Sequence, residues 1–224
     1  MNYKSIAVDG PSGAGKSTMA RMIAQALGYL YVDTGAIYRT LGLFTLRQGI
    51  SPDDAQAVAA LLPRAEIRMS YGEDGVQRMY LNGEDVTGAI RAPEVSEAAS
   101  RVSAYPPVRA FLLEMQRALA KAGNVIMDGR DIGTVVLPGA DVKIFLTASA
   151  EDRARRRLAE LLERGEQTGF ETVLADIVER DRRDSTRAVS PLRRAEDALL
   201  VDTTDQSLEE SFSVLLQTIR EKLT

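Results

Sequence analysis

The sequence predicts an α/β fold built around a parallel sheet. Short apolar segments alternate along the chain with longer segments in which apolar side chains recur every three or four positions, the patterns of buried strands and of amphipathic helices. The first strand and the first helix are joined by a glycine-rich loop, GPSGAGKST at 10–18. Over 66–86 the pattern instead alternates residue by residue and contains the turns GEDG and NG, so we expect a small antiparallel insertion there.

The glycine-rich loop has the spacing of a phosphate-binding motif. Gly10 is followed after four residues by Gly15-Lys16-Ser17, and the loop lies between an apolar strand at 5–8 and a helix. Glycines let backbone N–H groups turn toward phosphates, the helix N-terminus adds positive charge, the lysine reaches the terminal phosphates, and the hydroxyl holds Mg²⁺. The sequence therefore predicts a bound nucleoside triphosphate, held by Gly10, Pro11, Ser12, Gly13, Ala14, Gly15, Lys16, Ser17 and Thr18.

The remaining elements follow from periodicity and capping signals. Further strands are predicted at 30–33, 124–128, 142–146 and 198–202. Helices are predicted at 36–49, 94–103, 108–122, 151–163 and 171–185. Ser51 has the character of an N-cap with Pro52 at the first helical position, and Ser149 with Asp152 resembles a capping box. Ser207 is predicted to cap a last helix that ends at Leu223.

The composition excludes several classes of function. A net charge of −4 and a pI near 5.1 argue against a protein that holds a nucleic-acid polymer by a broad basic surface. The absence of cysteine excludes disulfides and thiolate metal sites, and the absence of histidine removes the usual general base near neutral pH. No apolar stretch has transmembrane length and no signal-peptide pattern is present, so we expect a cytoplasmic monomer with no membrane partner.

Polar side chains follow two of the predicted strands. Asp33 and Thr34 end the strand at 30–33, and the segment DGRDIGT places Asp128, Arg130 and Asp131 after the next one. In an open α/β sheet, ligands bind beyond the carboxyl ends of the strands. An acid that closes an apolar strand commonly orients Mg²⁺ opposite a phosphate loop, so we interpret Asp128 as the magnesium-site acid together with Ser17.

These segments together resemble the bacterial-type cytidylate kinases, within the nucleoside-monophosphate kinase group. The resemblance spans nearly the whole chain and is carried by DGPSGAGKST, DTGAIYR, GEDVT, SRVSAYPPVR, DGRDIGTVVLP, KIFL, RARRR and RDRRDSTRAVSPL. It implies one P-loop kinase domain over 1–224, with a five-stranded parallel sheet, an antiparallel insertion at about 63–92 and a mobile lid at about 150–170. The implied reaction is transfer of the γ-phosphate of ATP to CMP or dCMP with Mg²⁺.

The resemblance also assigns roles to residues of this chain. It implies that the acceptor is bound by Thr34, Arg39, Ser100, Arg109, Arg130, Asp131, Arg180, Asp184 and Arg187, of which Ser100, Arg109 and Asp131 surround cytosine. The residues it implies to be catalytic are Lys16 and Arg130 with the lid arginines Arg153, Arg156 and Arg157. Asp181, Arg182 and Arg183 we interpret as solvated.

Two departures from the family's pattern bear on these assignments. The family often has GKGT where this chain has GKST, which leaves open whether Ser17 or Thr18 contacts Mg²⁺. The family often has serine before the glycine of DTG, and Thr34 keeps the hydroxyl.

Other functions fit the phosphate loop less well. A kinase of the UMP, shikimate or gluconate type shares the core, but a shikimate- or gluconate-type enzyme does not need the antiparallel insertion. A GTP-dependent switch needs a guanine-reading Lys-x-Asp element, and this combination does not occur in the sequence. A transporter-type or motor ATPase needs a signature loop, which we do not find.

Overall fold

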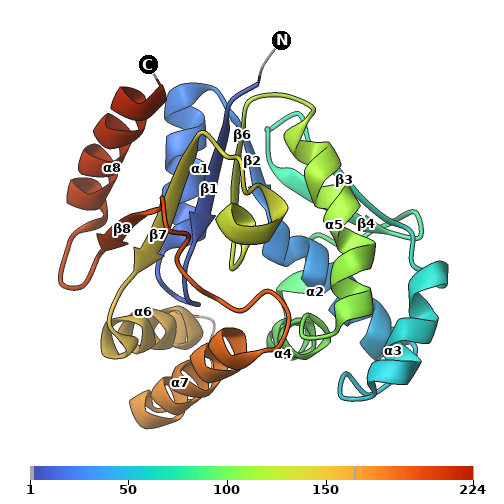
Figure 1. Ribbon diagram of the computed structural model, residues 1–224. Coiled ribbons are helices and arrows are strands. Elements are labelled where there is room, and N and C mark those ends of the chain that lie inside the picture. The colour runs from blue at the N-terminus through green and yellow to red at the C-terminus, as the bar shows by residue number, and fades with distance from the viewer. Residues whose placement is uncertain (1–2, 164, 224) are drawn as a thin grey trace. The chain divides into compact units, whose positions relative to one another are not determined.

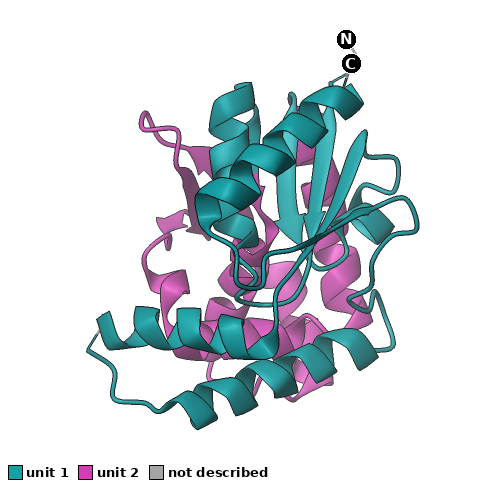
Figure 2. Ribbon diagram, turned by 90° about the vertical axis from the view of Figure 1, so that its left-hand side faces the viewer, with its two compact units in different colours: residues 1–31, 123–224 teal, residues 32–122 magenta. Residues whose placement is uncertain are grey.

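The computed structural model describes residues 3–163 and 165–223. Arg164, inside the predicted lid, lies outside the described residues. The chain divides into two compact units, 1–31 with 123–224 as unit 1 and 32–122 as unit 2 (Figure 2).

A five-stranded sheet lies mainly in unit 1. Its strands are β1 (Ser5–Asp9), β2 (Leu30–Asp33), β6 (Val125–Gly129), β7 (Val142–Thr147) and β8 (Leu199–Asp202), in the order β2-β6-β1-β7-β8. β1 pairs in parallel with β6 and β7, and β7 pairs in parallel with β8. The predicted parallel sheet is confirmed, and each predicted strand agrees with the observed one to within a residue at either end. Because the strand order reverses at β1, the loop that follows this strand lies at the topological switch point, where α/β sheets bind ligands.

Two helices of unit 1 pack against this sheet. α1 (Lys16–Leu27) and α8 (Leu208–Leu223) share an apolar cluster with β1, to which Ile23 and Ile219 contribute (Figure 1). Ser207 caps α8 as predicted: its hydroxyl accepts the backbone N–H of Glu210 at 3.2 Å, and the Glu210 carboxylate accepts the Ser207 N–H at 3.2 Å. This reciprocal pair is a capping box, which satisfies two otherwise unpaired N–H groups.

α6 (Ala150–Glu163) and α7 (Phe170–Thr186) lie side by side, below the end of β1 in Figure 1. They have a small apolar core of their own, built from Ala154, Leu161, Val173 and Ile177. The Ser149 hydroxyl accepts the N–H of Asp152 at 3.1 Å, so the predicted cap of α6 is present. A single π-helical turn, η3 (Ile132–Val136), follows β6.

Unit 2 contains helices and the predicted antiparallel sheet. The helices are α2 (Thr34–Arg47), α3 (Ala55–Leu61), α4 (Pro93–Val102) and α5 (Pro106–Ala120), with short 3₁₀ turns η1 (Leu62–Arg64) and η2 (Ala89–Arg91). The sheet has three strands, β3 (Ile67–Tyr71), β4 (Gln77–Leu81) and β5 (Glu84–Asp85). α2 and α4 approach closely at Gly42, where a Cβ atom would lie 2.9 Å from the Ala99 nitrogen. The apolar core of the unit is built from α2, α3, α4, α5 and β4.

Three helix starts differ from the sequence prediction by two residues or more. α2 begins at Thr34 because the Asp33 carboxylate accepts the N–H of Ala36 at 2.9 Å and caps the helix there. Ser51 is not an N-cap: its carbonyl accepts the N–H of Asp54 in a turn, and Asp54 caps α3 instead. α5 begins at Pro106, since proline suits the first helical position, where its missing N–H has no helical partner to lose.

Within 3–163 and 165–223, no helix combines the length with the apolar character that a membrane crossing requires.

Candidate active site

The phosphate loop occupies the turn between β1 and α1. Gly10 has φ 148, and a Cβ atom there would lie 1.9 Å from the Leu146 carbonyl oxygen, so no other residue fits. Gly15 has φ 84 and forms the N-cap of α1. The loop backbone therefore depends on the glycines that the motif prescribes.

Lys16 is the first residue of α1 and is 6% exposed. Its Nζ donates to the Pro11 carbonyl at 2.6 Å, which holds the side chain back across the loop. Burial, and next the charge of Arg130, lower the pKa of Lys16 well below its ordinary value, while Asp128 and Asp9 oppose the shift. Because bound phosphates would add negative charge, they would favour the protonated ammonium.

Asp128, in β6, lies at the same end of unit 1. Its carboxylate accepts hydrogen bonds from the Ser17 hydroxyl at 2.7 Å and from the Tyr31 hydroxyl at 3.1 Å. A hydroxyl and a carboxylate oxygen are hard donors of the kind that Mg²⁺ binds. Among the described residues no three acidic side chains form a metal cage, and Mg²⁺ beside a nucleotide usually uses one or two carboxylates together with the phosphates. The residues present therefore fit the ion.

Asp9 ends β1 immediately before the phosphate loop and is 4% exposed. Its two carboxylate oxygens accept the backbone N–H groups of Ile132 and Gly133, each at 2.7 Å. Burial raises the pKa of Asp9 to about 6, although these two N–H groups and the charge of Lys16 act in the opposite direction. The bonds connect the strand of the phosphate loop to the segment that carries Arg130 and Asp131.

A chain of ionic contacts joins that segment to α7. Arg130 Nε donates to the Asp184 carboxylate at 2.9 Å. The Arg187 guanidinium lies 3.8 Å from the other oxygen of Asp184 and 3.9 Å from Asp131. Burial acts to raise the pKa of Asp184, but Arg130 and Arg180 outweigh it and hold the pKa below its ordinary value. Unit 1 therefore brings together five of the predicted acceptor-binding residues: Arg130, Asp131, Arg180, Asp184 and Arg187.

The three predicted lid arginines of α6 have different surroundings. Arg153 is 5% exposed and donates to the carbonyls of Ala148 and Ser12 and, at 2.6 Å, to the Asp181 carboxylate. Arg156 donates to the Thr203 carbonyl at 2.9 Å. Arg157 pairs with Glu160 on the same helix at 3.0 Å. Arg153 thus ties α6 to the phosphate loop and to α7.

The interpretation of Asp181 as solvated is wrong, because this carboxylate forms the partly buried ion pair with Arg153. Arg182 is exposed and pairs with Glu179, and Arg183 is a half-buried neighbour of the same glutamate.

In unit 2, Asp33 holds Arg39 in place. The Asp33 carboxylate accepts from Arg39 at 2.7 Å and from Arg91 at 3.5 Å, and Gln77 bonds both the N–H and the carbonyl of Asp33. Burial acts to raise the pKa of Asp33, but Arg39 and then Arg91 lower it below its ordinary value. Thr34 is buried beside this network, at the first position of α2. Arg39 Nε is buried and has no hydrogen-bond partner within the described part of the chain.

The other predicted residues of unit 2 lie on α4 and α5. Arg109 is buried, donates to the Ser103 carbonyl at 3.1 Å and lies over the Tyr38 ring, 5.5 Å from its centroid. The Ser100 hydroxyl is buried and makes no hydrogen bond with any described residue. Since buried polar atoms are normally paired, this hydroxyl is suited to a ligand.

The protein-family model described as cytidylate kinase matches residues 6–221. The chain belongs to the cytidylate kinase family. It is 51% identical to the cytidylate kinase of Carboxydothermus hydrogenoformans over 97% of this chain and 97% of that protein. It is 50% identical to the cytidylate kinase of Geobacillus sp. (strain WCH70) over 99% of each. Among solved structures, an uncharacterized protein from Eubacterium ventriosum shares the fold, with a TM-score of 0.53 at 10% identity over 97% of this chain and 98% of that one.

Membership of the cytidylate kinase family confirms the resemblance that the sequence motifs indicated. The roles of individual site residues stay predictions. What the structure adds is a set of residues around them that the sequence did not single out: Asp9, Tyr31, Gln77 and Arg91. Asp9 carried a usable signal, since it is an acid at the end of a buried strand and next to the phosphate loop. Gln77 had no recognisable signal in the sequence, because its hydrogen-bond partner Asp33 lies 44 residues away.

The raised pKa of Asp9 predicts a pH dependence of stability. The folded protein holds this proton more tightly than the unfolded chain, so ionisation of Asp9 costs stability as the pH rises from 3.8 toward about 6. Two charged groups also act on the carboxyl group of Asp9: Asp131 raises its pKa, and Lys16 lowers it. Relative to an Asp9→Asn variant, the free energy of unfolding of the parent should fall by about 2 kcal/mol between about pH 4 and about pH 7. Denaturant unfolding of both proteins over this pH range measures the two free energies. A difference between them that does not change with pH would contradict the raised pKa of Asp9.

Proposed function

We propose that this chain transfers the γ-phosphoryl group of ATP to CMP or dCMP, producing CDP or dCDP and ADP. The observation that carries the proposal is the match to cytidylate kinases over 6–221, in a chain whose phosphate loop is complete and whose loop lysine is buried in place. The phosphate donor and the cytidine monophosphate acceptor both follow from this match, and no observation favours another acceptor.

The donor site is built from Gly10 to Thr18. Loop N–H groups and the start of α1 receive the phosphates, and Lys16 neutralises charge on the terminal ones. Ser17 and Asp128 are the residues that would hold Mg²⁺, and of the two neighbouring hydroxyls Ser17 is the one bonded to Asp128. Bound there, the ion would neutralise charge on the phosphate oxygens.

The acceptor needs binding and orientation rather than deprotonation. Its phosphate has a second pKa of about 6 and is already ionised near neutral pH, so no general base is required, which agrees with a chain lacking histidine. We assign the phosphate to Thr34, Arg39 and Arg130, and the cytosine to Ser100, Arg109 and Asp131. The ribose and phosphate contacts are assigned to Arg180, Asp184 and Arg187.

The arginines of α6 are the candidates for stabilising the phosphoryl group in flight. Arg156 and Arg157 keep part of their donor capacity at the surface, whereas Arg153 is committed to acceptors within unit 1. We therefore assign Arg156 and Arg157 to the transferring group and expect Arg153 to act mainly by holding the phosphate loop.

Replacement of Arg157 by alanine should lower kcat about tenfold while changing the KM for ATP much less, because an arginine that acts in the transition state affects turnover more than binding. Steady-state kinetics measure both constants. Arg155→Ala is the matched control, since Arg155 lies on the same helix, is 65% exposed and pairs with Asp152. If Arg157→Ala changes only the KM for ATP, this arginine binds the donor equally in the ground state and in the transition state.

A substrate panel tests the proposed function directly. The protein is incubated with ATP and Mg²⁺ and with CMP, dCMP, UMP, AMP or shikimate, and ADP formation is measured. We expect ADP with CMP and dCMP well above the other acceptors. ADP formation with UMP or shikimate in preference to CMP would overturn the proposal.

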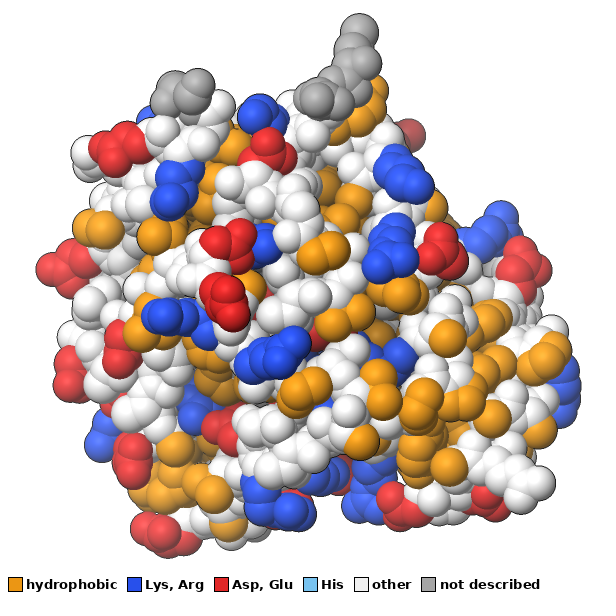
Figure 3. All heavy atoms as spheres, viewed as in Figure 1, with side chains coloured by type: hydrophobic (Ala, Val, Ile, Leu, Met, Phe, Trp, Pro, Cys, Tyr) orange, Lys and Arg blue, Asp and Glu red, His pale blue; other side chains and the backbone are white. Residues whose placement is uncertain are grey.

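We also infer a monomer that acts in the cytoplasm on small molecules, without a nucleic-acid or membrane partner. The net charge of −4 supports the absence of a nucleic-acid partner, as does the distribution of charge in Figure 3, where acidic and basic side chains are interspersed over the face in view. Light scattering measures the mass in solution, and a stable dimer would contradict the inference.

A further inference from the structure

We propose that Asp9 is a positioning residue for acceptor recognition, because its carboxylate fixes the segment that carries Arg130 and Asp131. The proposal rests on the proposed function, since it concerns how the acceptor is read. Asp9 itself does not contact the substrate. It acts through the backbone that follows Asp131.

The first observation is the geometry of the two hydrogen bonds. Asp9 accepts from two successive backbone N–H groups, those of Ile132 and Gly133, both at 2.7 Å and both buried. Asp131 directly precedes the first of them. Short bonds to an ionised acceptor are stronger than neutral ones, and two of them define both the position and the direction of a backbone segment. The start of η3 is therefore fixed relative to β1.

The second observation is the close approach of the segment. A Cβ atom at Gly133 would lie 3.3 Å from a carboxylate oxygen of Asp9 and 3.1 Å from the Lys143 side chain. The segment rests directly on Asp9, with no room for an intervening group. A Cβ atom at Gly133 would therefore crowd the carboxylate of Asp9 and the stem of Lys143, and the segment or these side chains must shift by a few tenths of an ångström.

The third observation is the place of Asp9 in the fold. β1 pairs with β6 so that Asp9 lies opposite Gly129, the residue before Arg130. Its backbone continues into the phosphate loop, while its side chain supports the acceptor-binding segment. A substitution that keeps the backbone should thus disturb acceptor recognition more than donor binding.

The expected result concerns Asp9→Asn, which has nearly the same shape but one acceptor oxygen. One of the two N–H groups then faces an amide nitrogen, and the segment should shift away from it. We expect the KM for CMP to rise about tenfold and the CMP over UMP ratio of kcat/KM to narrow by about the same factor, with the KM for ATP within about threefold of the parent. Steady-state kinetics with each substrate measure these constants.

Asp141→Asn is the matched control. Asp141 also accepts a backbone N–H, that of Ser5 at 2.8 Å, but it supports the amino end of β1, where it pairs with Lys4. Asp141→Asn should lower the free energy of unfolding without changing the KM for CMP or the CMP over UMP ratio of kcat/KM. If Asp9→Asn and Asp141→Asn change all kinetic constants equally, Asp9 has only a general structural role and the inference is wrong.

Gly133→Ala provides an independent test that leaves Asp9 intact. The added methyl should crowd the contact between this segment and Asp9, and it should change the KM for CMP and the base preference in the same direction as Asp9→Asn. If both Asp9→Asn and Gly133→Ala fold and keep the parent's CMP constants, the inference is wrong. A parent protein that does not phosphorylate CMP at all would instead overturn the proposed function, so the two failures are distinguishable.

Discussion

Replacement of Lys16 by methionine should lower kcat by roughly 100-fold or more, the effect of losing about 3 kcal/mol of transition-state stabilisation from one charged group. Methionine keeps the length and much of the packing of the lysine stem but carries no charge. The variant loses the hydrogen bond to the Pro11 carbonyl, but the glycine conformations of the loop and the close approach of Gly10 to Leu146 remain. The fold should therefore survive while turnover does not. Single-turnover rates with ATP and CMP measure the loss.

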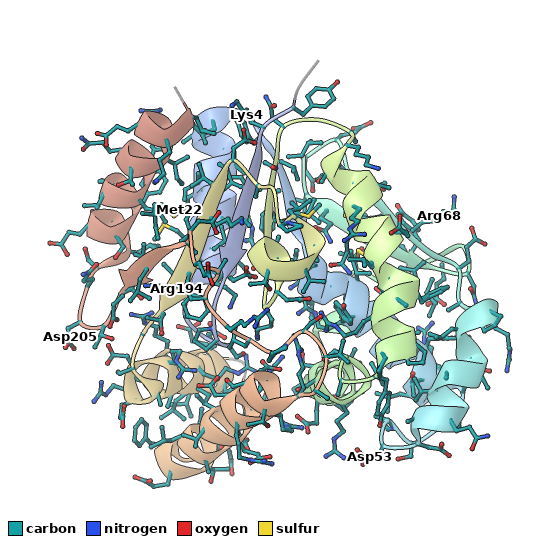
Figure 4. The ribbon with its side chains drawn as sticks, in the orientation of Figure 1. Lys4, Met22, Asp53, Arg68, Arg194 and Asp205 are labelled. Atoms are coloured by element: carbon teal, nitrogen blue, oxygen red, sulfur yellow. The ribbon has the colours of Figure 1, made fainter. Side chains whose placement is uncertain are left out.

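Lys4→Met is the control for this change. Lys4 lies next to β1 at its amino end, where it pairs with Asp141 (Figure 4). The same lysine-to-methionine change is therefore made away from the phosphate loop. We expect parental turnover from this variant. A folded Lys16→Met protein with kcat within about threefold of the parent would remove Lys16 from the mechanism.

Much of the fold could be predicted because local signals and burial agree. The strand segments are continuous apolar runs, as expected for a parallel sheet covered on both faces, and β1 and β6 are almost completely buried. The capping residue Ser207 was equally readable, since Glu210 follows at the spacing of a capping box. Where competing signals were present the prediction failed: Ser51 and Asp54 can both cap a helix, and the turn between them decides for Asp54.

The site could be predicted as a set of residues but not as a set of contacts. The spacing of Arg153, Arg156 and Arg157 places them on one helix face, yet the acceptors that occupy Arg153 come from the phosphate loop and from α7. Likewise, Asp181 is partly buried in an ion pair with Arg153, which lies 28 residues away in sequence. Such pairs depend on tertiary packing, which sequence periodicity does not encode.

The base preference of the enzyme should depend on the carboxylate of Asp131. Cytosine offers a donor at N4 beside acceptors at N3 and O2, so a matching pocket needs an acceptor next to a forked donor. A carboxylate at Asp131 and the hydroxyl of Ser100 can accept from N4, and the Arg109 guanidinium can donate to N3 and O2. Uracil reverses two of these positions, because its O4 accepts and its N3 carries a proton. A site whose polar groups are left unpaired rejects the wrong ligand by roughly 10⁴-fold at best, and a rotating serine hydroxyl reduces this.

Asp131→Asn should therefore narrow the CMP over UMP ratio of kcat/KM by about 100-fold, since an amide presents either a donor or an acceptor to position 4 of the base. Most of the change should come from slower reaction with CMP, because the amide no longer carries the charge that strengthens the bond to N4. Asp141→Asn makes the same substitution at the amino end of β1 and should keep the parental ratio. Competition kinetics with CMP and UMP in one reaction measure the ratio directly. If the parent has no preference for CMP, or if Asp131→Asn keeps the full preference, the carboxylate of Asp131 does not read the base.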